Sequence, residues 1–310
     1  MRAVSAADID RLLDYPGLIA AIREAFAGAA VAPARHHHRI PRPGAEATLL
    51  LMPAWQEDGA GFIGVKIVSV FPDNAARARP SVIGTYLLLA GDSGEPLATF
   101  DGVALTLWRT AATSALVASV LARPDASRMV MVGAGALAPH LIAAHAAVRP
   151  LTHVAIWNRH HDKAAALAQR LTRPGLTVVA TDHLESAVGS ADIVSTATLA
   201  AEPVVFGAWL KPGAHVDLVG AYTPAMREAD DTAIERAIVY VDTRAGMTES
   251  GDIARPLASR ALRESDIAGD LYDIARGNAR PRQSDDITLF KSVGNAIEDL
   301  AAAVAVWSRL

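Results

Sequence analysis

The segment 128–159, RMVMVGAGALAPHLIAAHAAVRPLTHVAIWNR, constrains the fold more than any other part of this 310-residue chain. A short apolar run leads into the glycine-rich stretch 133–138, an apolar pattern of helical length follows, and a second apolar run spans 153–157. In the pattern G-x-G-x-x-A between a strand and a helix, the two glycines permit a tight turn and close approach of a pyrophosphate, and the alanine permits close packing. The segment therefore predicts a strand–helix–strand unit that binds a dinucleotide, rather than a purely structural turn.

The phosphates of such a ligand are expected at the start of the helix, where the backbone N–H groups have no partner within the helix. The residues expected to contact the cofactor there are Gly133, Gly135, Ala136 and Leu137. Thr196 and Thr198, at the end of another predicted strand, are expected to contact it through backbone and hydroxyl groups.

The residues after the second strand of this unit indicate which dinucleotide binds. An acidic side chain there would accept hydrogen bonds from the ribose of NAD, whereas this chain has Asn158 and Arg159. The guanidinium of Arg159 offers a planar fork of donors to a 2′-phosphate. NADP(H) is therefore the preferred cofactor, with NAD(H) still open. In the alternative, Arg159 is an ordinary solvated arginine and Asp162 binds the ribose.

Beyond this unit, strands alternate with helices as in a doubly wound parallel sheet. The expected elements are helix 162–173, strand 177–180, helix 183–190, and strands 193–196, 215–219 and 238–241. The ligand of such a sheet lies outside the carboxyl ends of its strands.

The N-terminal third has a different pattern. Two helices are expected first, one capped by Ser5 and one that begins at Leu18. An antiparallel or mixed sheet is expected to follow, its strands separated by turns that include Asp58-Gly59. Its strands are 35–40, 47–52, 62–70, 82–90 and 96–101. Helix 105–122 follows, with a hinge at 123–125, and 288–310 is expected to form one long helix that returns to the first domain.

These elements predict an α/β protein of two domains. Residues 1–122 and 288–310 are expected to form an α+β substrate-binding and dimerisation domain completed by the C-terminal helix, and 123–287 a Rossmann-type NAD(P)-binding domain.

Composition narrows the functional class. The net charge of −4 gives no footprint for nucleic acid or an anionic membrane, and the absence of cysteine excludes disulfides and thiolate chemistry. No signal peptide or apolar helix long enough to span a bilayer is expected, so a cytoplasmic enzyme is the default.

Further motifs are spread along almost the whole chain. They are Met52-Pro53-Ala54, Gly64-Val65-Lys66, Gly94-Glu95-Pro96-Leu97-Ala98, Arg109-Thr110-Ala111-Ala112, the glycine loop 132–138, GAYTPAMRE at 220–228, Glu249-Ser250-Gly251-Asp252 and FKSVG at 290–294. Together they resemble the ornithine cyclodeaminase and mu-crystallin family. The resemblance implies a homodimer built through the N-terminal sheet domain and a small-molecule substrate.

That family includes ornithine cyclodeaminases, alanine and related amino-acid dehydrogenases, and NAD(P)H-dependent reductases of cyclic ketimines. In the first two branches an aspartate that serves the substrate amine follows the strand ending at Gly220; here the matching residue is Tyr222. The segment 223–228 instead is similar to the ketimine reductase branch. Tyr222 is therefore expected beside the cofactor.

Two cations stand in apolar surroundings. Lys66 lies within the predicted strand GFIGVKIVSVF, and Arg109 lies near the start of an apolar helix. Burying either charge is costly without a partner. The resemblance places both at the substrate carboxylate as the catalytic and substrate-binding residues. The alternatives are a solvated face of the sheet for Lys66 and a buried pair with an internal acid for Arg109.

The run Arg35-His36-His37-His38-Arg39 invites a metal hypothesis, but a strand sends successive side chains to opposite faces, so no metal site is expected. The resemblance places an arginine of this region at the substrate carboxylate, with Arg35 the better match and Arg39 second.

Several acidic residues have expected structural roles. Asp230 and Asp231 are expected to cap a helix, with Glu228 and Asp230 also open as proton-relay groups. Glu298 and Asp299 are expected to cap or to pair internally.

The resulting expectation is NAD(P)H-dependent reduction of a small cyclic 2-imino acid, Δ1-pyrroline-2-carboxylate or Δ1-piperideine-2-carboxylate. The alternatives are an ornithine cyclodeaminase, an alanine-dehydrogenase-like enzyme and a non-catalytic mu-crystallin-like binding protein.

Overall fold

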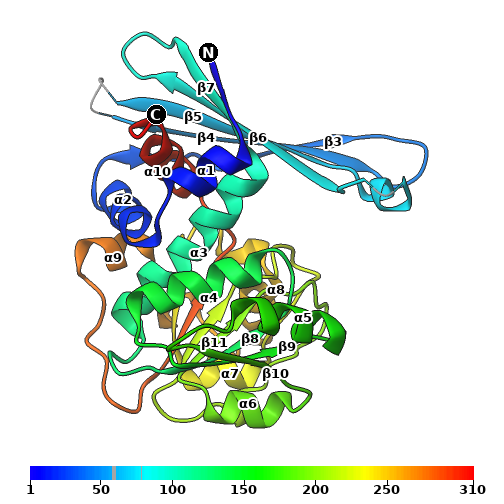
Figure 1. Cartoon of the computed structure of the whole chain (residues 1–310), viewed down its shortest axis with the longest axis vertical. Helices are drawn as coiled ribbons and strands as arrows, with labels where there is room; N and C mark the ends of the chain where they lie inside the picture. The colour runs from blue at the N-terminus through cyan, green and yellow to red at the C-terminus, as the bar shows by residue number, and fades with distance from the viewer. Residues whose placement is uncertain (58–60, 78) are drawn as a thin grey trace. The chain divides into compact units, whose positions relative to one another are not determined.

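The computed structural model describes residues 1–57, 61–77 and 79–310 and divides into two compact units (Figure 1). The first unit comprises Met1–Thr110 and Asn295–Leu310, and the second comprises Ala111–Gly294. The first boundary therefore lies within helix α3 (Gly102–Leu121) rather than at the expected 122/123, and the second lies after 294 rather than at 287/288.

The first unit is built on a largely antiparallel sheet, as expected. Its pairing order is β1 (Arg2–Val4), β7 (Pro96–Asp101), β6 (Val82–Ala90), β5 (Phe62–Val70), β4 (Ala47–Gln56) and β2 (Ala30–Val31), with β3 (His36–Ile40) also paired to β4. Only β1 and β7 pair in parallel among the described strands of this sheet. The edge strands β1 and β2 were not predicted, and the turn expected at Asp58-Gly59 lies outside the described residues.

The helices of the first unit begin at side-chain caps. Ser5 and Asp8 form a capping box at the start of α1 (Ala6–Leu12), which confirms the Ser5 prediction. Pro16 lies in the first turn of α2 (Tyr15–Ala27), where its missing N–H costs nothing, and Asp14 caps that helix. Helix α10 (Ala296–Trp307) packs against α2 and against β4, β5 and β6.

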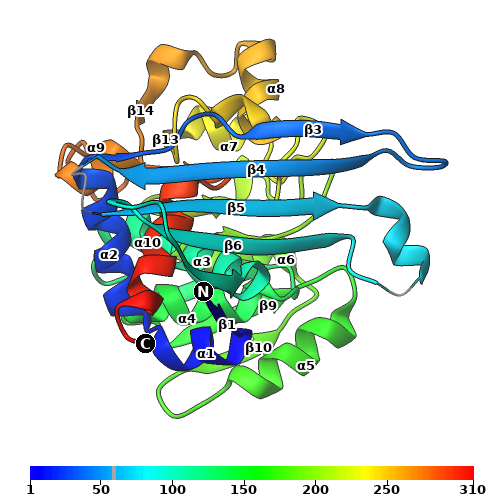
Figure 2. The same cartoon turned by 90° about the horizontal axis from the view of Figure 1, so that it is seen from above.

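The two faces of this sheet differ. Met52, Lys66 and Tyr86 lie in register on β4, β5 and β6, and all three are buried on the face that α10 covers. Gly64 shares that face, and a Cβ there would lie 1.8 Å from the Tyr86 hydroxyl oxygen, so only glycine fits. Among the described residues, no helix of the first unit lies over the opposite face of β3–β6, which Figure 2 shows turned toward the viewer.

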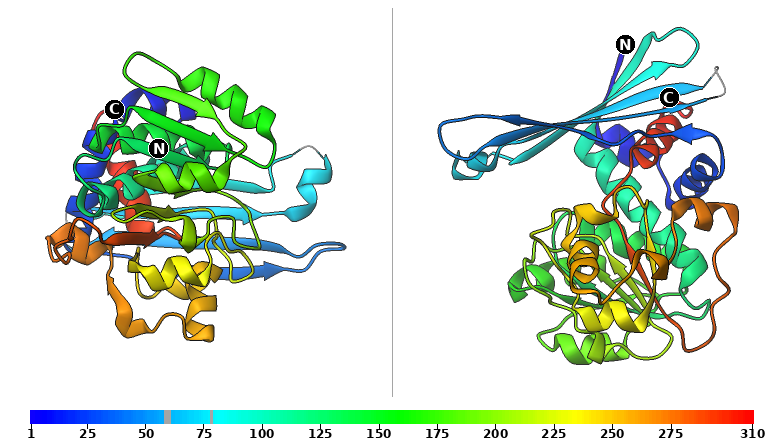
Figure 3. Two further views of the ribbon diagram at one scale, coloured as in Figure 1. Left: turned by 90° about the horizontal axis from the view of Figure 1, so that it is seen from below. Right: turned by 180° about the vertical axis from the view of Figure 1, so that it is seen from behind.

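The second unit is built on a parallel sheet, which confirms the α/β doubly wound prediction (Figure 3). Its order is β10 (Thr177–Ala180), β9 (His153–Trp157), β8 (Arg128–Val132), β11 (Ile193–Thr196), β12 (His215–Leu218), β15 (Ile287–Lys291), β13 (Ala237–Val241) and β14 (Ile267–Gly269). From β8 the chain runs outward through β9 and β10, and then returns to β11 on the other side of β8. The topological switch point, where ligands of such sheets bind, therefore lies between β8 and β11.

The helices of the second unit are α4 (Leu137–Val148), α5 (His161–Leu171), α6 (Leu184–Ser190), α7 (Asp231–Arg236), α8 (Gly251–Ser259) and α9 (Leu271–Arg276). The main core is formed by the aliphatic side chains of β8, β11, β12, β13 and β15 with those of α6 and α7.

The expectation of one helix over 288–310 is wrong. Residues 287–291 form strand β15, which pairs with β12 and β13 inside the sheet of the second unit. Gly294 then adopts a left-handed φ of 86°, and Asn295 opens a new helix with a capping box that includes Glu298. The apolar spacing of this segment suits a helix, but the glycine and the cap divide it into two elements.

The expectation that no helix reaches the length of a bilayer span is also wrong. Helix α3 is long and apolar enough by length and composition, but 67% of its most apolar window is buried within the fold, as in the core helix of a globular protein.

Candidate functional site

The glycine loop forms an open cradle at the carboxyl end of β8. Gly133 has a φ of 115°, and a Cβ there would lie 2.5 Å from the carbonyl oxygen of Ala197 in the loop after β11. Gly135 has nothing within 4 Å of its Cβ position, so the space above it is open. No side chain caps α4, whose N-cap residue is Ala136. Open space beside uncapped N–H groups suits a pyrophosphate, so these residues fit a dinucleotide.

The loop after β9 presents polar groups to solvent. Arg159 is exposed, and no ion pair of its guanidinium is seen within the described ranges. The side-chain amide of Asn158 donates to the carbonyl of His160 at 2.9 Å, and His161 Nδ1 lies 2.6 Å from Asp182. Arg159 is therefore the side chain of this loop best able to receive a further anionic group.

The loops after β11 and β12 carry the remaining predicted cofactor residues. Thr196 is buried, whereas Tyr222 on the loop after β12 is 52% exposed and Leu199 on the loop after β11 is 77% exposed. The hydroxyl of Thr198 donates to Glu228 at 2.8 Å. The proton of that hydroxyl is thus used within the protein, and the predicted contact of Thr198 with a cofactor stays a prediction.

In the first unit, Lys66 contacts a carboxylate from α10. Its Nζ lies 2.6 Å from Asp299 Oδ2, and the lysine is 3% exposed. The pair joins residues 233 apart in sequence. The solvated-face alternative for Lys66 is thereby excluded.

Arg109 is bound to the same helix. Its Nε donates to Asp299 Oδ1 at 3.1 Å, and its Nη1 donates to Glu298 Oε2 at 2.7 Å. The other oxygen of Glu298 accepts the backbone N–H of Asn295 in the capping box. Glu298 and Asp299 thus pair internally, as expected, and the buried-pair alternative for Arg109 holds in this structure.

The four charges form one buried cluster, which we call the α10 charge cluster: Lys66, Arg109, Glu298 and Asp299. Two cations balance two carboxylates, and each carboxylate is fully buried. Burial, assisted by the Arg109 charge, lowers the pKa of Lys66 to about 8, although Asp299 opposes the shift. Lys66 can therefore exchange a proton near neutral pH.

Tyr86 lies beside the cluster. Its hydroxyl is buried and has no hydrogen-bond partner within the described ranges. Burial, followed by the charge of Asp299, raises the pKa of Tyr86 well above its ordinary value. Tyr86 therefore keeps its proton and adds no charge to the cluster.

The register of β3 separates the two candidate arginines. His36 pairs with Leu51. When this register is extended by one residue, Arg35 lies opposite Met52, which pairs with Lys66 on β5. Arg39 pairs with Thr48, roughly 13 Å further along the strand, and forms an exposed contact of 3.6 Å with Glu46. Arg35 thus lies nearer to Lys66 in the register than Arg39 does, and its contact with the substrate carboxylate stays a prediction.

The remaining histidines and acids suggest no metal site. Within the described ranges, no group of three or more histidine, aspartate or glutamate side chains could hold an ion. His36 and His38 lie on one face of β3 with ring centroids 6.5 Å apart, as the strand parity predicts.

The second unit contains buried charged residues whose burial and partners were not predicted from the sequence. Asp230 caps α7, as expected, but Glu228 is fully buried and binds backbone N–H groups, and Asp252 pairs with Lys291 at 3.1 Å. Asp217 accepts from Ser195 at 2.7 Å, and burial raises its pKa. The sequence does contain one indication of such buried charges: Lys291 ends a strand whose other residues are mostly apolar.

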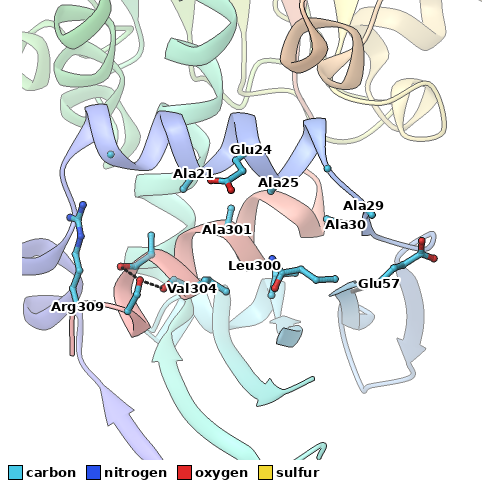
Figure 4. Close-up of a pocket in the computed structure, with 15 residues that line it drawn as sticks. Ala21, Glu24, Ala25, Ala29, Ala30, Glu57, Leu300, Ala301, Val304 and Arg309 are labelled. Carbon is cyan, nitrogen blue, oxygen red and sulfur yellow. Dashed lines mark hydrogen bonds between the residues drawn. The ribbon is translucent and has the colours of Figure 1, made fainter. Parts of the chain in front are cut away.

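A separate groove of about 510 Å³ lies between α2 and α10 (Figure 4). Alanine, glycine and serine together make up most of its lining, which also includes the charged residues Glu24, Glu57 and Arg309. Its described lining includes no buried charged side chain, so we assign it no role in chemistry.

Comparison with known proteins places the chain in a family. The model of the ornithine cyclodeaminase/mu-crystallin family matches residues 2–310. The chain belongs to this family. A relative from Paracoccus denitrificans, Delta(1)-pyrroline-2-carboxylate reductase, is 44% identical over 259 residues, covering 83% of this chain and 81% of the relative.

Two solved structures of the family resemble the whole chain. Delta(1)-pyrroline-2-carboxylate reductase of Thermococcus litoralis, in complex with NADH and L-proline, has a TM-score of 0.92 and 31% identity and covers 100% of this chain and 97% of its own. An archaeal alanine dehydrogenase dimer with bound NAD has a TM-score of 0.91 and 25% identity and covers 100% and 95%. The expected family is thus confirmed.

The α10 charge cluster leads to a stability prediction. Arg109→Met should lower the free energy of unfolding by about 3–5 kcal/mol, because Glu298 keeps its charge in a buried site without this partner. Adding Glu298→Gln should restore part of the loss, as measured by urea unfolding. Arg39→Met, which breaks an exposed pair, is the matched control and should cost less than about 1 kcal/mol. Equal losses for Arg109→Met and Arg39→Met would contradict the cluster.

Proposed function

We propose that the chain is an NAD(P)H-dependent reductase of a small cyclic 2-imino acid, with Δ1-pyrroline-2-carboxylate the leading substrate. The observation that carries the proposal is the neutral, buried α10 charge cluster, in which Lys66 and Arg109 already bind carboxylates of α10 and are the cations that would also receive the substrate carboxylate. The open cradle at Gly135 in the second unit supports a dinucleotide. Two of the proteins named above are Delta(1)-pyrroline-2-carboxylate reductases, and one of them is in complex with NADH and L-proline.

Charge balance favours this substrate. A 2-imino acid with a protonated C=N group carries one positive and one negative charge, so it adds no net charge to a cluster that is already neutral. Its carboxylate can bind Lys66 and Arg109, and Asp299 can accept from the iminium N–H. A ligand with an unbalanced charge would leave a buried charge without a partner, which is costly.

The chain holds and orients the reactants. The bound nicotinamide supplies the hydride that reduces the C=N carbon. Gly133, Gly135, Ala136 and Leu137 would hold the pyrophosphate, and the first unit would fix the carboxylate so that the imine carbon is held in one orientation. Lys66 Nζ is the group of this cluster with a pKa near the working range, and it can deliver a proton to the substrate or keep its positive charge on the carboxylate.

The experiment that tests the function is NADPH and NADH oxidation with a panel of cyclic imines, run beside ammonia release from ornithine. Wild type should reduce the carboxylated imines and release no ammonia. Because the Lys66 ammonium is present below its pKa and lost above it, kcat/KM should fall about tenfold per pH unit above about pH 8. Ammonia release without imine reduction would identify a cyclodeaminase instead.

The matched control for the pH profile is Lys66→Arg, which keeps the charge across this range. The fall that begins near pH 8 should disappear in this variant, whereas any titration of the imine itself should remain in both proteins. Retained kcat would assign Lys66 to charge alone, and a large loss of kcat would assign it to proton delivery. An unchanged fall in the variant would refute the role of Lys66.

We further propose a preference for NADPH, based on the exposed Arg159 after β9 and on the lack of an acid at that position. Arg159→Asp should raise the KM for NADPH about 10- to 100-fold, because a charge-assisted contact with the 2′-phosphate becomes repulsion, and should change that for NADH little. Arg170→Asp, the same charge change in the last turn of α5, is the control and should alter neither. Equal effects of Arg159→Asp on both cofactors would remove the basis for the preference.

We also propose a homodimer that covers the open face of the first unit's sheet. The side chains on that face of β4, β5 and β6 include Leu51, Trp55, Ile67, Ile83 and Leu87, and Ile67 and Ile83 are 38% and 48% exposed. A contiguous apolar face of this kind is typical of an interface. One structural neighbour is an alanine dehydrogenase dimer.

Sedimentation velocity tests the dimer. Wild type should have the mass of two copies, and Ile67→Asp should shift it toward one, because a charge would be buried in the interface. Val179→Asp, at an aliphatic residue 50% exposed on edge strand β10 of the second unit, is the control and should stay dimeric. A wild-type protein with the mass of one copy would contradict the proposal.

A further inference from the structure

Glu228 occupies an unusual place in the second unit. It is fully buried, and its carboxylate joins the loops that follow two neighbouring strands, β11 and β12. One oxygen accepts from the backbone N–H of Thr198 at 2.7 Å and from its hydroxyl at 2.8 Å. The other accepts from the N–H of Gly220 at 2.7 Å and, at 3.3 Å, from that of Ala221. Both oxygens are thus used entirely by donors of these two loops.

A second layer holds Glu228 itself in place. Its backbone N–H donates to Asp252 Oδ1 at 2.7 Å, and Asp252 Oδ2 pairs with the ammonium of Lys291, which ends β15. The carbonyl of Glu228 accepts the N–H groups of both Val204 and Val205. The carboxyl ends of three adjacent strands are therefore linked through one side chain and its support.

The loops after β11 and β12 pack closely against each other. A Cβ on Gly220 would lie 2.2 Å from the carbonyl oxygen of Thr198 and 2.5 Å from Glu228 Oε1. The loop after β11 also touches the glycine cradle, since a Cβ on Gly133 would lie 2.5 Å from the carbonyl oxygen of Ala197. Displacing the Thr198 loop would therefore alter the edge of the crevice at the switch point between β8 and β11.

We propose that Glu228 is a positioning residue that fixes the loops after β11 and β12 against the nicotinamide half of the cofactor. The inference rests on the proposed nicotinamide function and adds a residue that does not touch the cofactor. The adenosine half is assigned to the Gly133–Gly135 cradle and the Arg159 loop, and none of the hydrogen bonds described for the Glu228 carboxylate involves either. Loss of Glu228 should therefore separate the two halves of cofactor binding.

A carboxylate suits this position because it accepts at both oxygens and offers no donor. The amide introduced by Glu228→Gln would be nearly the same size, but its NH₂ group would face either the Thr198 or the Gly220 N–H. One loop would then lose its acceptor, and a buried N–H without a partner is costly. Glu228→Gln is therefore a small change in shape with a specific effect on one loop.

The experiment compares intact cofactor with its fragment, using the full chain. Dissociation constants for NADPH and for 2′-phospho-ADP-ribose, which lacks the nicotinamide, are measured by calorimetry, together with the fluorescence of bound NADPH. If wild type prefers NADH, NADH and ADP-ribose replace this pair. In Glu228→Gln, we expect NADPH to bind about tenfold or more weakly, the fluorescence to shift toward that of free NADPH, kcat to fall, and fragment affinity to stay within about twofold.

The control is Asp230→Asn, also an acid-to-amide change, two residues away. Asp230 accepts from the N–H groups of Gly207 and Ala233 and caps α7, so its loss should lower the thermal midpoint. The ratio of the two dissociation constants and the NADPH fluorescence should not change in this variant. Circular dichroism identifies any loss of folding in either protein.

The outcomes separate the two proposals. Equal weakening of NADPH and fragment in a folded Glu228→Gln protein, or no weakening of either, would overturn the positioning role. If that variant does not fold, Glu228→Asp, which keeps the charge but shortens the side chain, should show the same separation, and equal weakening there would also overturn it. A wild-type chain that bound no nicotinamide cofactor would refute the proposed function, and this inference with it.

Discussion

The first unit depends on the balance between two buried cations and two carboxylates. Lys66 and Arg109 lie on a strand and a helix that are otherwise uncharged, and either charge would be costly there alone. Glu298 and Asp299 neutralise them from the first turn of α10, where the helix dipole also favours carboxylates. The same contacts attach α10 to the sheet, so the stability of the unit and the chemistry of the site share one set of ion pairs.

The second unit solves a different problem, which is to hold backbone close to an anionic ligand. At the cradle the device is the absence of a side chain, since Gly135 leaves open space and Gly133 allows contact with the next loop. The loops after β11 and β12 are held differently, because the buried carboxylate of Glu228 accepts hydrogen bonds from their backbone N–H groups. At the same carboxyl edge of the sheet, the cradle after β8 thus keeps its N–H groups available, whereas the loops after β11 and β12 use theirs to gain rigidity.

Much of the fold could be predicted from the sequence because its signals are local. The bounds of β5, β6 and β7 follow from runs of β-formers between glycine and proline turns, and the cradle follows from a motif in its required context. Strand β15 was missed because its apolar residues also suit a helix, and the edge strands β1 and β2 are too short to show a period. These three segments are strands because they pair with strands that are distant in the sequence.

The candidate site shows the same division. Lys66 and Arg109 stood out because a charge in an apolar segment requires a reason, and that reason is local. Their partners could not be assigned, because Asp299 lies 233 residues beyond Lys66 and its side chain resembles an ordinary helix-start acid. Glu228 was likewise noticed, but four donors from two loops are a tertiary property that no spacing reveals.

The place of β15 in the sheet has a consequence for synthesis of the chain. It lies between β12 and β13, and β13 and β14 join the other strands only through it. During translation, the segments that form β8 to β14 must emerge before this strand does, and α10 with its two carboxylates comes later still. Until then the sheet is split, with open strand edges that can pair wrongly. Complete pairing of this sheet therefore depends on a strand that is synthesised after all of its other described strands.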